Sequence, residues 1–576
     1  MINIALGGEK LQNSILTPIT LWEGLEIPTL SEYEVIHESI VDGILFRKII
    51  FNGRKIGEEQ IKIFALLAIP QEQSIEKAGL LLLPDMHASV EFEFVKKYAL
   101  QGYTVLMPDY RGEFEGAEQY TKYPQDISYA NYTIAKECID VVEKTEQETP
   151  WYEWVNVALY SLSLLKNLRH IEVVGAVGIR AGGDILWQLA AISNDLACAV
   201  SVCAGGWRIH GNQLKHAELI EEQSMSVGQR KFLACLEAQG YAPLIKSPML
   251  MLCACNDKGF NVDRAYDTFA RINSAQEKAI YFSTNSTGQL GFTSLQDLDL
   301  FLKKYLLGEQ IYIPQPVQIS LEEMDGELLA SIKYDDNAKI KNCQVYVTEE
   351  LVNPAFRDWR KCKLKQQIAS DECLYSVETL KGAKDVFVFA NIDYHCGFAI
   401  SSKITHLSIE GKHYTNQITT SKILYSSSEG KDGFLAEVPK TQLLGGVLIH
   451  TEHPAIEFIE GPAQIIGISS QFTLKFYRLY SVKDKLDETS LIKFDVYAPN
   501  GGELTLTIAH ILENGYDIEK YTHTISLQQG EYWSSCIVSS NEFNNEQGKR
   551  LQTFASSLYL AFNANKKFCI NNIINL

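Results

Sequence analysis

Long apolar runs, an excess of positive charge and paired cysteines are all missing from this chain of 576 residues. No stretch approaches the about 18 uninterrupted apolar residues of a membrane-spanning helix, so we expect no membrane partner. Lys and Arg number 52 against 71 Asp and Glu, which gives a formal net charge of −19. Nucleic acids select basic patches, so this acidity also argues against a nucleic-acid partner.

The start of the chain, MINIALGGEKLQNS, lacks the basic stretch, apolar run and small-residue cleavage site of a secretory signal. The twelve cysteines form no CxxC pair, and several lie inside apolar strand patterns. Free, buried thiols in a reducing compartment are the favoured interpretation, which predicts a cytoplasmic protein. We expect neither a metal nor a cofactor.

Hydrophobic residues make up 46% of the chain and charged residues 21%, as in a folded protein of several domains. Apolar runs such as AGLLLLPD at 78–85 alternate with helical patterns as far as about residue 306. Such runs are typical of parallel strands buried on both faces. The alternation predicts a doubly wound α/β domain over 1–308, with a β extension at its N-terminus and a lid-like helical insertion at about 207–245.

Helical periodicity nearly disappears after Gly308. Short strand patterns such as DVFVFANIDY and LIKFDVYA are separated by Gly, Asn, Asp and Ser clusters, which indicates β-sandwiches. We predict an immunoglobulin-like domain over 309–402 and a jelly-roll sandwich over 403–576, the second similar to carbohydrate-binding modules.

One segment has the context of a catalytic elbow. Hydrolases with an α/β sheet carry their nucleophile on a strained strand-to-helix turn with the pattern GxSxG. The apolar strand at 173–177 is followed by Gly178-Ile179-Arg180-Ala181-Gly182-Gly183, and a helix is predicted from Asp184. The glycines of the elbow are present, but arginine stands where the nucleophile is expected.

Residues 20–306 resemble the acetylxylan esterase and dienelactone hydrolase branch of the α/β-hydrolase superfamily. The resemblance rests on LLLPD (81–85), GYTVLMPDYRG (102–112), GIRAGGDILWQLAA (178–191), CACNDKGFNVDRAYDT (253–268) and LDLFLKKYL (298–306). It implies a catalytic triad in the chain order Ser, acid, His. The nucleophile position is Arg180, the acid position is Asp257, and Gly288 lies nearest the histidine position.

No histidine occurs between His216 and His395, so two of the three triad members are absent. A guanidinium remains protonated in proteins and offers neither a nucleophilic lone pair nor a base. The resemblance further implies an oxyanion-hole-like pair of N–H groups from Ala181 and from Met86 or His87.

Two roles for Arg180 stay open at this point. The preferred one is an ion pair with Asp257, because a partly buried carboxylate that has lost its partner is costly. The other is an anion-binding site, because Arg180 precedes a helix N-terminus. In this second role Arg180 and Asp257 are the candidate ligand-binding residues.

Two functions follow from the resemblance. The first is a catalytically degenerate, esterase-like protein that serves as a scaffold or binds a ligand or partner. The second is an active carboxylic ester hydrolase on acylated carbohydrates with a non-standard site. The partners expected are a small anionic ligand or a carbohydrate, and a protein partner or a second copy of the chain.

Overall fold

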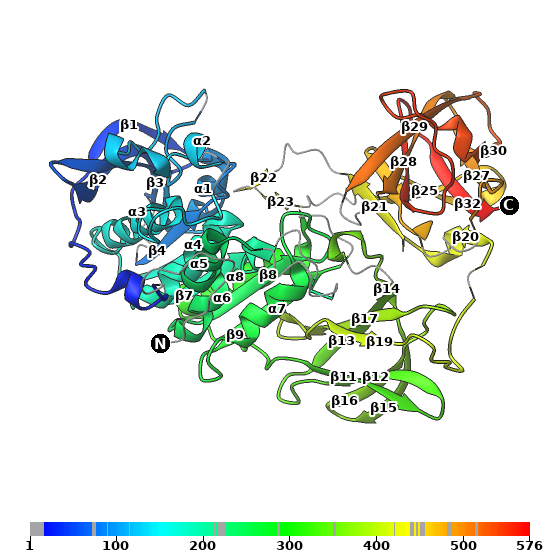
Figure 1. Ribbon diagram of the computed structural model, residues 1–576, viewed down its shortest axis with the longest axis horizontal. Coiled ribbons are helices and arrows are strands. Elements are labelled where there is room, and N and C mark those ends of the chain that lie inside the picture. Colours follow the sequence, from blue (N-terminus) through cyan, green and yellow to red (C-terminus); the bar gives the residue numbers. More distant parts are fainter. Residues whose placement is uncertain are drawn as a thin grey trace.

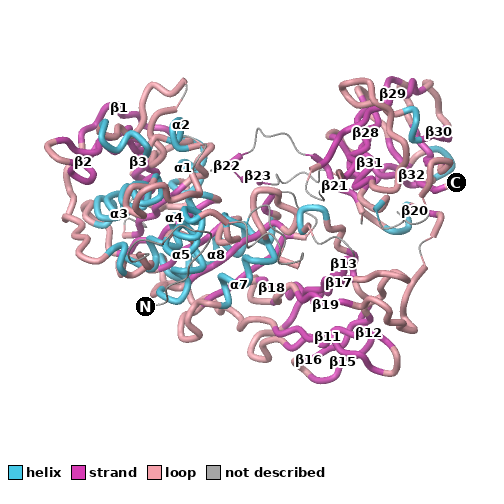
Figure 2. Tube along the Cα trace, in the orientation of Figure 1, coloured by secondary structure: helices cyan, strands magenta, loops and turns pink. Residues whose placement is uncertain are grey.

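The computed structural model describes residues 16–71, 77–88, 90–114, 116–136, 139–210, 215–216, 225–284, 289–349, 353–419, 421–431, 433–437, 443–444, 447–449, 456–480, 486–512 and 517–576. Three parts follow one another along the chain (Figure 1). The first combines strands and helices, and the other two are built from strands. The long helices all belong to the first part (Figure 2).

A nine-stranded sheet forms the centre of the first part, in the order β1-β2-β3-β5-β4-β6-β7-β8-β9. The strands from β4 to β9 are parallel, and β1 to β3 extend the sheet in antiparallel fashion. The parallel strands are buried almost throughout, as their apolar runs predict. The nine strands are β1 (Glu34–Val41), β2 (Ile44–Ile56), β3 (Glu59–Pro70), β4 (Ala78–Leu83), β5 (Thr104–Pro108), β6 (Val173–Ile179), β7 (Cys198–Val202), β8 (Met249–Ala254) and β9 (Lys278–Ser283).

Helices cover both faces of this sheet. A Cβ added at Gly79 of β4 would meet Leu165 of α3, and one added at Gly175 of β6 would meet Leu306 of α8. Gly79 pairs with Val174, the residue before Gly175, so the two glycines face opposite sides of the sheet. The helices are α1 (Phe92–Ala99), α2 (Tyr132–Ala135), α3 (Pro150–Lys166), α4 (Ala181–Ile192), α5 (Val227–Cys235), α6 (Ala238–Tyr241), α7 (Val262–Ala270) and α8 (Phe292–Leu306).

The predicted N-terminal β extension begins with a hairpin. Strands β1 and β2 pair around Asp42 and Gly43, whose φ angles are 52° and 75°. Positive φ at both turn residues matches the twist of the flanking strands, which explains why a DG step occurs there.

The predicted helical insertion contains α5, α6 and two short 3₁₀ turns among its described residues. It lies beside α4: the Gln188 side chain of α4 donates a hydrogen bond to the Leu236 carbonyl between α5 and α6. Residues 211–214 and 217–224 of the insertion lie outside the described part of the chain.

The second part is a sandwich of two antiparallel sheets, β11-β12-β16-β15 and β14-β13-β17-β18, with β19 also paired to β17. Strand β19 lies beyond the predicted domain end at residue 402, so that boundary is set too early. The error arose because the short pattern THLS carries no strand signal of its own and is ordered by pairing with β17. The strands are β11 (Gln318–Met324), β12 (Glu327–Lys333), β13 (Ile340–Glu349), β14 (Arg360–Lys361), β15 (Lys363–Ala369), β16 (Glu372–Ser376), β17 (Asp385–Tyr394), β18 (Ala399–Ser401) and β19 (Thr405–Ser408).

The third part is a larger antiparallel sandwich, with sheets β24-β25-β32-β27-β30, to which β20 is added, and β21-β26-β31-β28-β29. Alternate residues of β27 are buried, as expected of a strand with one face on a core. The strands are β20 (Ile423–Tyr425), β21 (Phe434–Glu437), β24 (Glu457–Glu460), β25 (Ile466–Ser469), β26 (Thr473–Phe476), β27 (Leu491–Tyr497), β28 (Gly502–Ile511), β29 (Ile518–Leu527), β30 (Trp533–Ser539), β31 (Ser557–Ala564) and β32 (Cys569–Asn575).

A short segment of the third part reaches back to the first. Strand β23 (Val447–Ile449) pairs with β22 (Leu443–Leu444) and, in parallel, with β10 (Gln289–Leu290). Strand β10 follows the loop at the sequence-predicted histidine position, so chain from the C-terminal half borders that edge of the α/β part.

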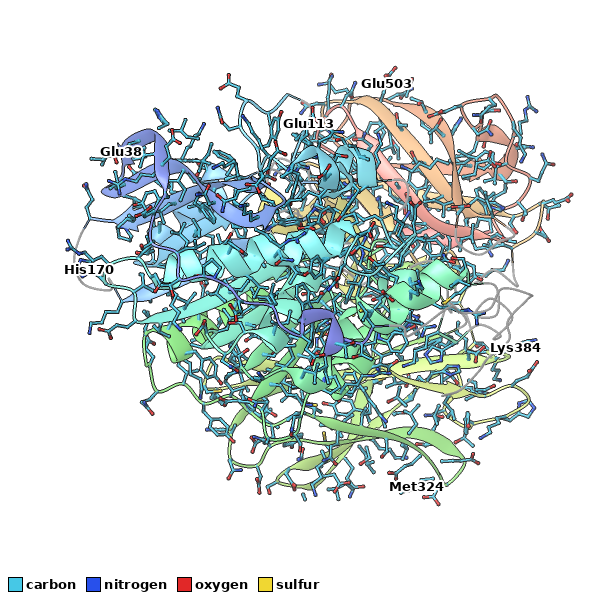
Figure 3. All side chains as sticks on the ribbon, turned by 60° about the vertical axis from the view of Figure 1, so that its left-hand side comes forward. Glu38, Glu113, His170, Met324, Lys384 and Glu503 are labelled. Carbon is cyan, nitrogen blue, oxygen red and sulfur yellow. The ribbon has the colours of Figure 1, made fainter. Side chains whose placement is uncertain are left out.

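The side chains of Glu38 and Glu113 in the first part and of Glu503 in the third part are exposed and project from the surface (Figure 3). Among the described residues, no helix combines the length and apolar character needed to cross a bilayer.

Candidate functional site

The candidate site lies where the strand order reverses. Strand β4 lies next to β6, yet the chain leaves β4 toward β5 on one side and leaves β6 toward β7 on the other. A crevice forms at the carboxyl ends of two such strands, and ligands of α/β proteins bind there. The residues after β4 (84–87) and Arg180 after β6 are therefore neighbours.

The elbow is preserved in its backbone. Arg180 has φ 50° and ψ −116°, a strained conformation for a residue with a side chain. A Cβ at Gly178 would lie 2.4 Å from the Gly182 carbonyl oxygen, and one at Gly182 would lie 2.2 Å from the Leu83 oxygen. A Cβ at Gly183 would lie 2.4 Å from Ala204 Cβ. The turn therefore requires these glycines, although its central residue is no longer a nucleophile.

The Arg180 side chain forms a two-point ion pair with Asp257. Nη1 donates to Oδ1 at 3.2 Å and Nη2 donates to Oδ2 at 2.7 Å. The backbone N–H of Gly259 also donates to Asp257 Oδ1, at 2.9 Å. The pairing predicted from the sequence is thus present. Burial acts to lower the pKa of Arg180, but the attraction of Asp257 outweighs it and the pKa lies above its ordinary value.

The two N–H groups predicted to form an oxyanion-hole-like pair already donate to a carboxylate of the protein itself. The N–H of Met86 donates to Asp85 Oδ1 at 2.8 Å, and the N–H of Ala181 reaches the same oxygen at 3.4 Å. Asp85 is 6% exposed. This residue ends the LLLPD motif, but nothing in the sequence indicated that its side chain would fold back onto these donors.

The histidines His87 and His216 have their contacts outside this cluster. The His87 side chain is exposed and hydrogen-bonds through Nδ1 to the Tyr132 hydroxyl at 3.0 Å. Gly288 lies outside the described residues. The His216 ring lies against the ring of His406 of the second part in a tilted arrangement, with centroids 4.3 Å apart, and burial lowers the pKa of His216 to about 4.

A second arginine near the elbow was not predicted from the sequence. Arg208 Nε donates to Asp140 at 3.1 Å, and Nη1 lies 3.5 Å from Asp184 Oδ2. Burial raises the pKa of Asp184 to about 6, although Arg208 opposes the shift. Burial also raises the pKa of Glu237 to about 8. Its carboxyl group accepts hydrogen bonds from the backbone N–H groups of Arg208 and Ile209. These residues come from distant segments, so no sequence spacing signals the cluster.

The loop that carries Asp257 is also a junction between parts. The Asn256 side-chain amide donates to the Arg357 carbonyl at 2.5 Å. Arg357 in turn forms a buried two-point ion pair with Asp263 of α7, at 2.6 and 2.7 Å. Phe356, beside it, joins a small apolar cluster with residues of the third part, among them Tyr559. All three parts therefore meet within a few residues of the acid position.

No three His, Cys, Asp or Glu side chains are arranged to hold a metal ion in the portions of the chain that the structure describes. Cys203 borders the elbow, but burial raises its pKa to about 12, so it is a thiol and not a reactive thiolate.

Comparison with known proteins gave structural likeness only. No protein-family model matches the chain, and no curated protein sequence does. An acetyl xylan esterase from Paenibacillus sp. R4 is 12% identical with a TM-score of 0.38, over 50% of this chain and 92% of that one. Acetyl xylan esterase 1 from Thermoanaerobacterium sp. JW/SL YS485 is 15% identical with a TM-score of 0.36, over 48% and 87%. An acylaminoacyl peptidase from Pyrococcus horikoshii is 12% identical with a TM-score of 0.33, over 49% and 51%.

The strand order, the crossover point and the strained elbow are those of an α/β-hydrolase fold, as the sequence predicts for this half of the chain. The remainder is rich in β-strands, also as predicted. The chain therefore combines an α/β-hydrolase fold with a β-rich C-terminal half.

Proposed function

We propose that the α/β part is a non-catalytic, esterase-like scaffold that has kept its crevice for binding and has lost the machinery for acyl transfer. The observation that carries this proposal is Asp85 Oδ1, which accepts both N–H groups that would stabilise an oxyanion. The Arg180–Asp257 ion pair also supports the proposal, because it ties the nucleophile position to the acid position.

Acyl transfer needs a nucleophile, a base and donors aimed at the developing oxyanion. Arg180 supplies neither of the first two. Each oxyanion-hole donor typically contributes about 2.7–4 kcal/mol to the transition state. With Asp85 in that place, a second negative charge about 4 Å away would instead be repelled by about 4 kcal/mol at an effective dielectric constant of about 20. The site therefore opposes the charge that ester hydrolysis develops.

The junction beside Asp257 supports a scaffolding role. In a working triad the acid loop must hold a mobile imidazole, whereas here Asp257 is held by Arg180 and its neighbour Asn256 by the second part. The crevice edge thus takes part in holding the three parts together.

The test is hydrolysis of p-nitrophenyl acetate by the purified full-length protein. We expect no turnover above that of the heat-denatured protein, and none after Arg180→Ser, because the serine would still lack a histidine. Turnover that is lost in both Arg180→Ala and Asp257→Ala would overturn the proposal and support an active ester hydrolase. Turnover that survives both substitutions would place any activity away from the elbow.

A further inference from the structure

A hollow open to solvent lies directly beside the Arg180–Asp257 pair. Its lining combines two guanidinium groups with aromatic surface. The residues that matter here are Arg180, Arg208, Trp207, Phe260, Asp184 and Asn261. The second arginine is one that triad geometry does not require.

The two arginines present hydrogen-bond donors to this hollow. A guanidinium has five N–H bonds. Two of those on Arg180 reach Asp257, and its side chain is 21% exposed. On Arg208 one N–H reaches Asp140 and Nη1 lies beside Asp184, and its side chain is 20% exposed. About three N–H bonds on each arginine therefore have no acceptor among the residues that the structure describes. A ligand that supplies acceptor atoms fits such a surface.

One helix N-terminus adds to the same preference. Helix α7 begins at Val262, directly after Asn261, which lines the hollow. Helix N-termini carry partial positive charge and favour anions.

Neighbouring carboxylates and the loss of hydration favour a ligand with a single negative charge. Asp257 pairs with Arg180, while Asp140 and Asp184 lie against Arg208, and Asp184 also lines the hollow. Attraction falls with distance, so a guanidinium in direct contact outweighs a carboxylate one group further away. A doubly charged anion would double the attraction and the repulsion alike, but its cost of losing hydration grows with the square of its charge.

We propose that this hollow binds a short-chain carboxylate, with its carboxylate group between Arg180 and Arg208 and its apolar tail against Trp207 and Phe260. This inference rests on the proposed function, because a catalytic elbow would turn over an ester at the same place. A planar carboxylate accepts two parallel hydrogen bonds from a guanidinium, which a point-like anion does not.

The test uses butanoate as the probe in titration calorimetry and thermal shift, at constant ionic strength. Small ligands with few atoms bind weakly, so we expect saturable binding in the millimolar range. Butanamide has the same shape without the charge, and we expect it to bind at least about tenfold more weakly, because a charge-assisted hydrogen bond is about twice as strong as a neutral one. Inorganic phosphate should also bind more weakly than butanoate.

The variant that removes the site is Arg180→Met with Asp257→Leu, which replaces the ion pair by apolar groups of similar size and so leaves the fold intact. Its control is Arg47→Met with Glu38→Leu, which removes a more exposed arginine–carboxylate pair on the β1–β2 hairpin. Loss of butanoate affinity by about tenfold or more in the first variant alone supports the proposal.

If the two double variants bind butanoate equally well, the site is not at Arg180. If the unaltered protein binds butanamide as well as butanoate, the charge of the ligand is not recognised. Absence of saturable binding by the unaltered protein also overturns the inference. Turnover of p-nitrophenyl acetate would contradict the proposed function. A failure to bind butanoate would contradict only the carboxylate site and would leave the result of the hydrolysis assay unchanged.

Discussion

Removing the Arg180 side chain should destabilise the α/β part, because Asp257 would be left buried without its cation. The Asp257 side chain is 4% exposed, and without Arg180 it would keep the hydrogen bonds from the Gly259 N–H and the Cys203 thiol but no cationic partner. Arg180→Ala removes both guanidinium contacts. It does not relieve the backbone strain, since alanine at φ 50° is strained as well.

The expected magnitude follows from the burial of the pair. Breaking a buried ion pair by removing one partner costs about 3–5 kcal/mol. Arg180 retains some exposure, 21% of its side chain, so we expect the lower end, about 3 kcal/mol. At about 2 °C for each kcal/mol in a domain of this size, the apparent melting temperature should fall by about 6 °C.

Tryptophan fluorescence during thermal unfolding is a suitable measurement. Five of the seven tryptophans, Trp22, Trp151, Trp154, Trp187 and Trp207, lie in the α/β part, so its unfolding dominates the signal. The control is Lys77→Ala, which breaks an exposed pair with Glu172 (70% and 64% exposed). That change should cost at most about 1 kcal/mol.

The melting temperature of a double variant tests the same ion pair in a second way. Replacing both partners, as Arg180→Met with Asp257→Leu, should return the melting temperature to near that of the unaltered protein, because no buried charge is left alone. An Arg180→Ala variant as stable as the unaltered protein would refute the argument. So would a double variant less stable than Arg180→Ala.

Two further predictions concern the surroundings of the site. The pKa of Glu237 is raised by burial from an ordinary 4.5 to about 8, so its contribution to stability is present below about pH 4.5 and is lost as the pH rises toward 8. Glu237→Gln should therefore remove this loss of stability, which amounts to a few kcal/mol over that range at about 1.4 kcal/mol per pKa unit. The melting temperature of the variant should then fall less steeply with pH than that of the unaltered protein, and an equally steep fall would contradict the raised pKa of Glu237. Arg357→Ala should leave Asp263 uncompensated at the junction, where the two side chains are 0% and 1% exposed, and cost about 3–5 kcal/mol. Limited proteolysis should then release the second part faster than in Lys363→Ala, which breaks a largely exposed pair with Glu378, and equal rates in the two variants would show that this ion pair does not hold the junction.

Local patterns were sufficient for much of the fold. The apolar runs and the helical periodicity predicted the α/β alternation, and the DG step predicted the β1–β2 hairpin, because both depend on residues close together in the chain. The elbow was also recognisable, since its glycines are demanded by contacts below 3 Å with backbone or neighbouring Cβ atoms. The early cut at residue 402 shows the limit of this reasoning, because β19 is ordered only by its pairing with β17.

The candidate site, like the fold, was predictable from the sequence only in part. Arg180 and Asp257 were identified from motif positions, and their pairing followed from the cost of a lone buried carboxylate. Asp85 was quoted within a motif and given no role. Its side-chain rotamer, which brings Oδ1 to the N–H groups of Met86 and Ala181, is decided by packing between two strands that are 90 residues apart in the sequence.

By itself, then, the sequence determined that the elbow has no nucleophile and that no histidine occurs between His216 and His395, because chemical identity is a property of each residue alone. Only the tertiary structure decided that Asp85 occupies the oxyanion position, that Arg208 joins Arg180 beside a hollow, and that His216 lies against the second part. These contacts join segments far apart in the chain. Their geometry is set by how the sheet, the insertion and the sandwich pack together, which no local spacing of residues encodes.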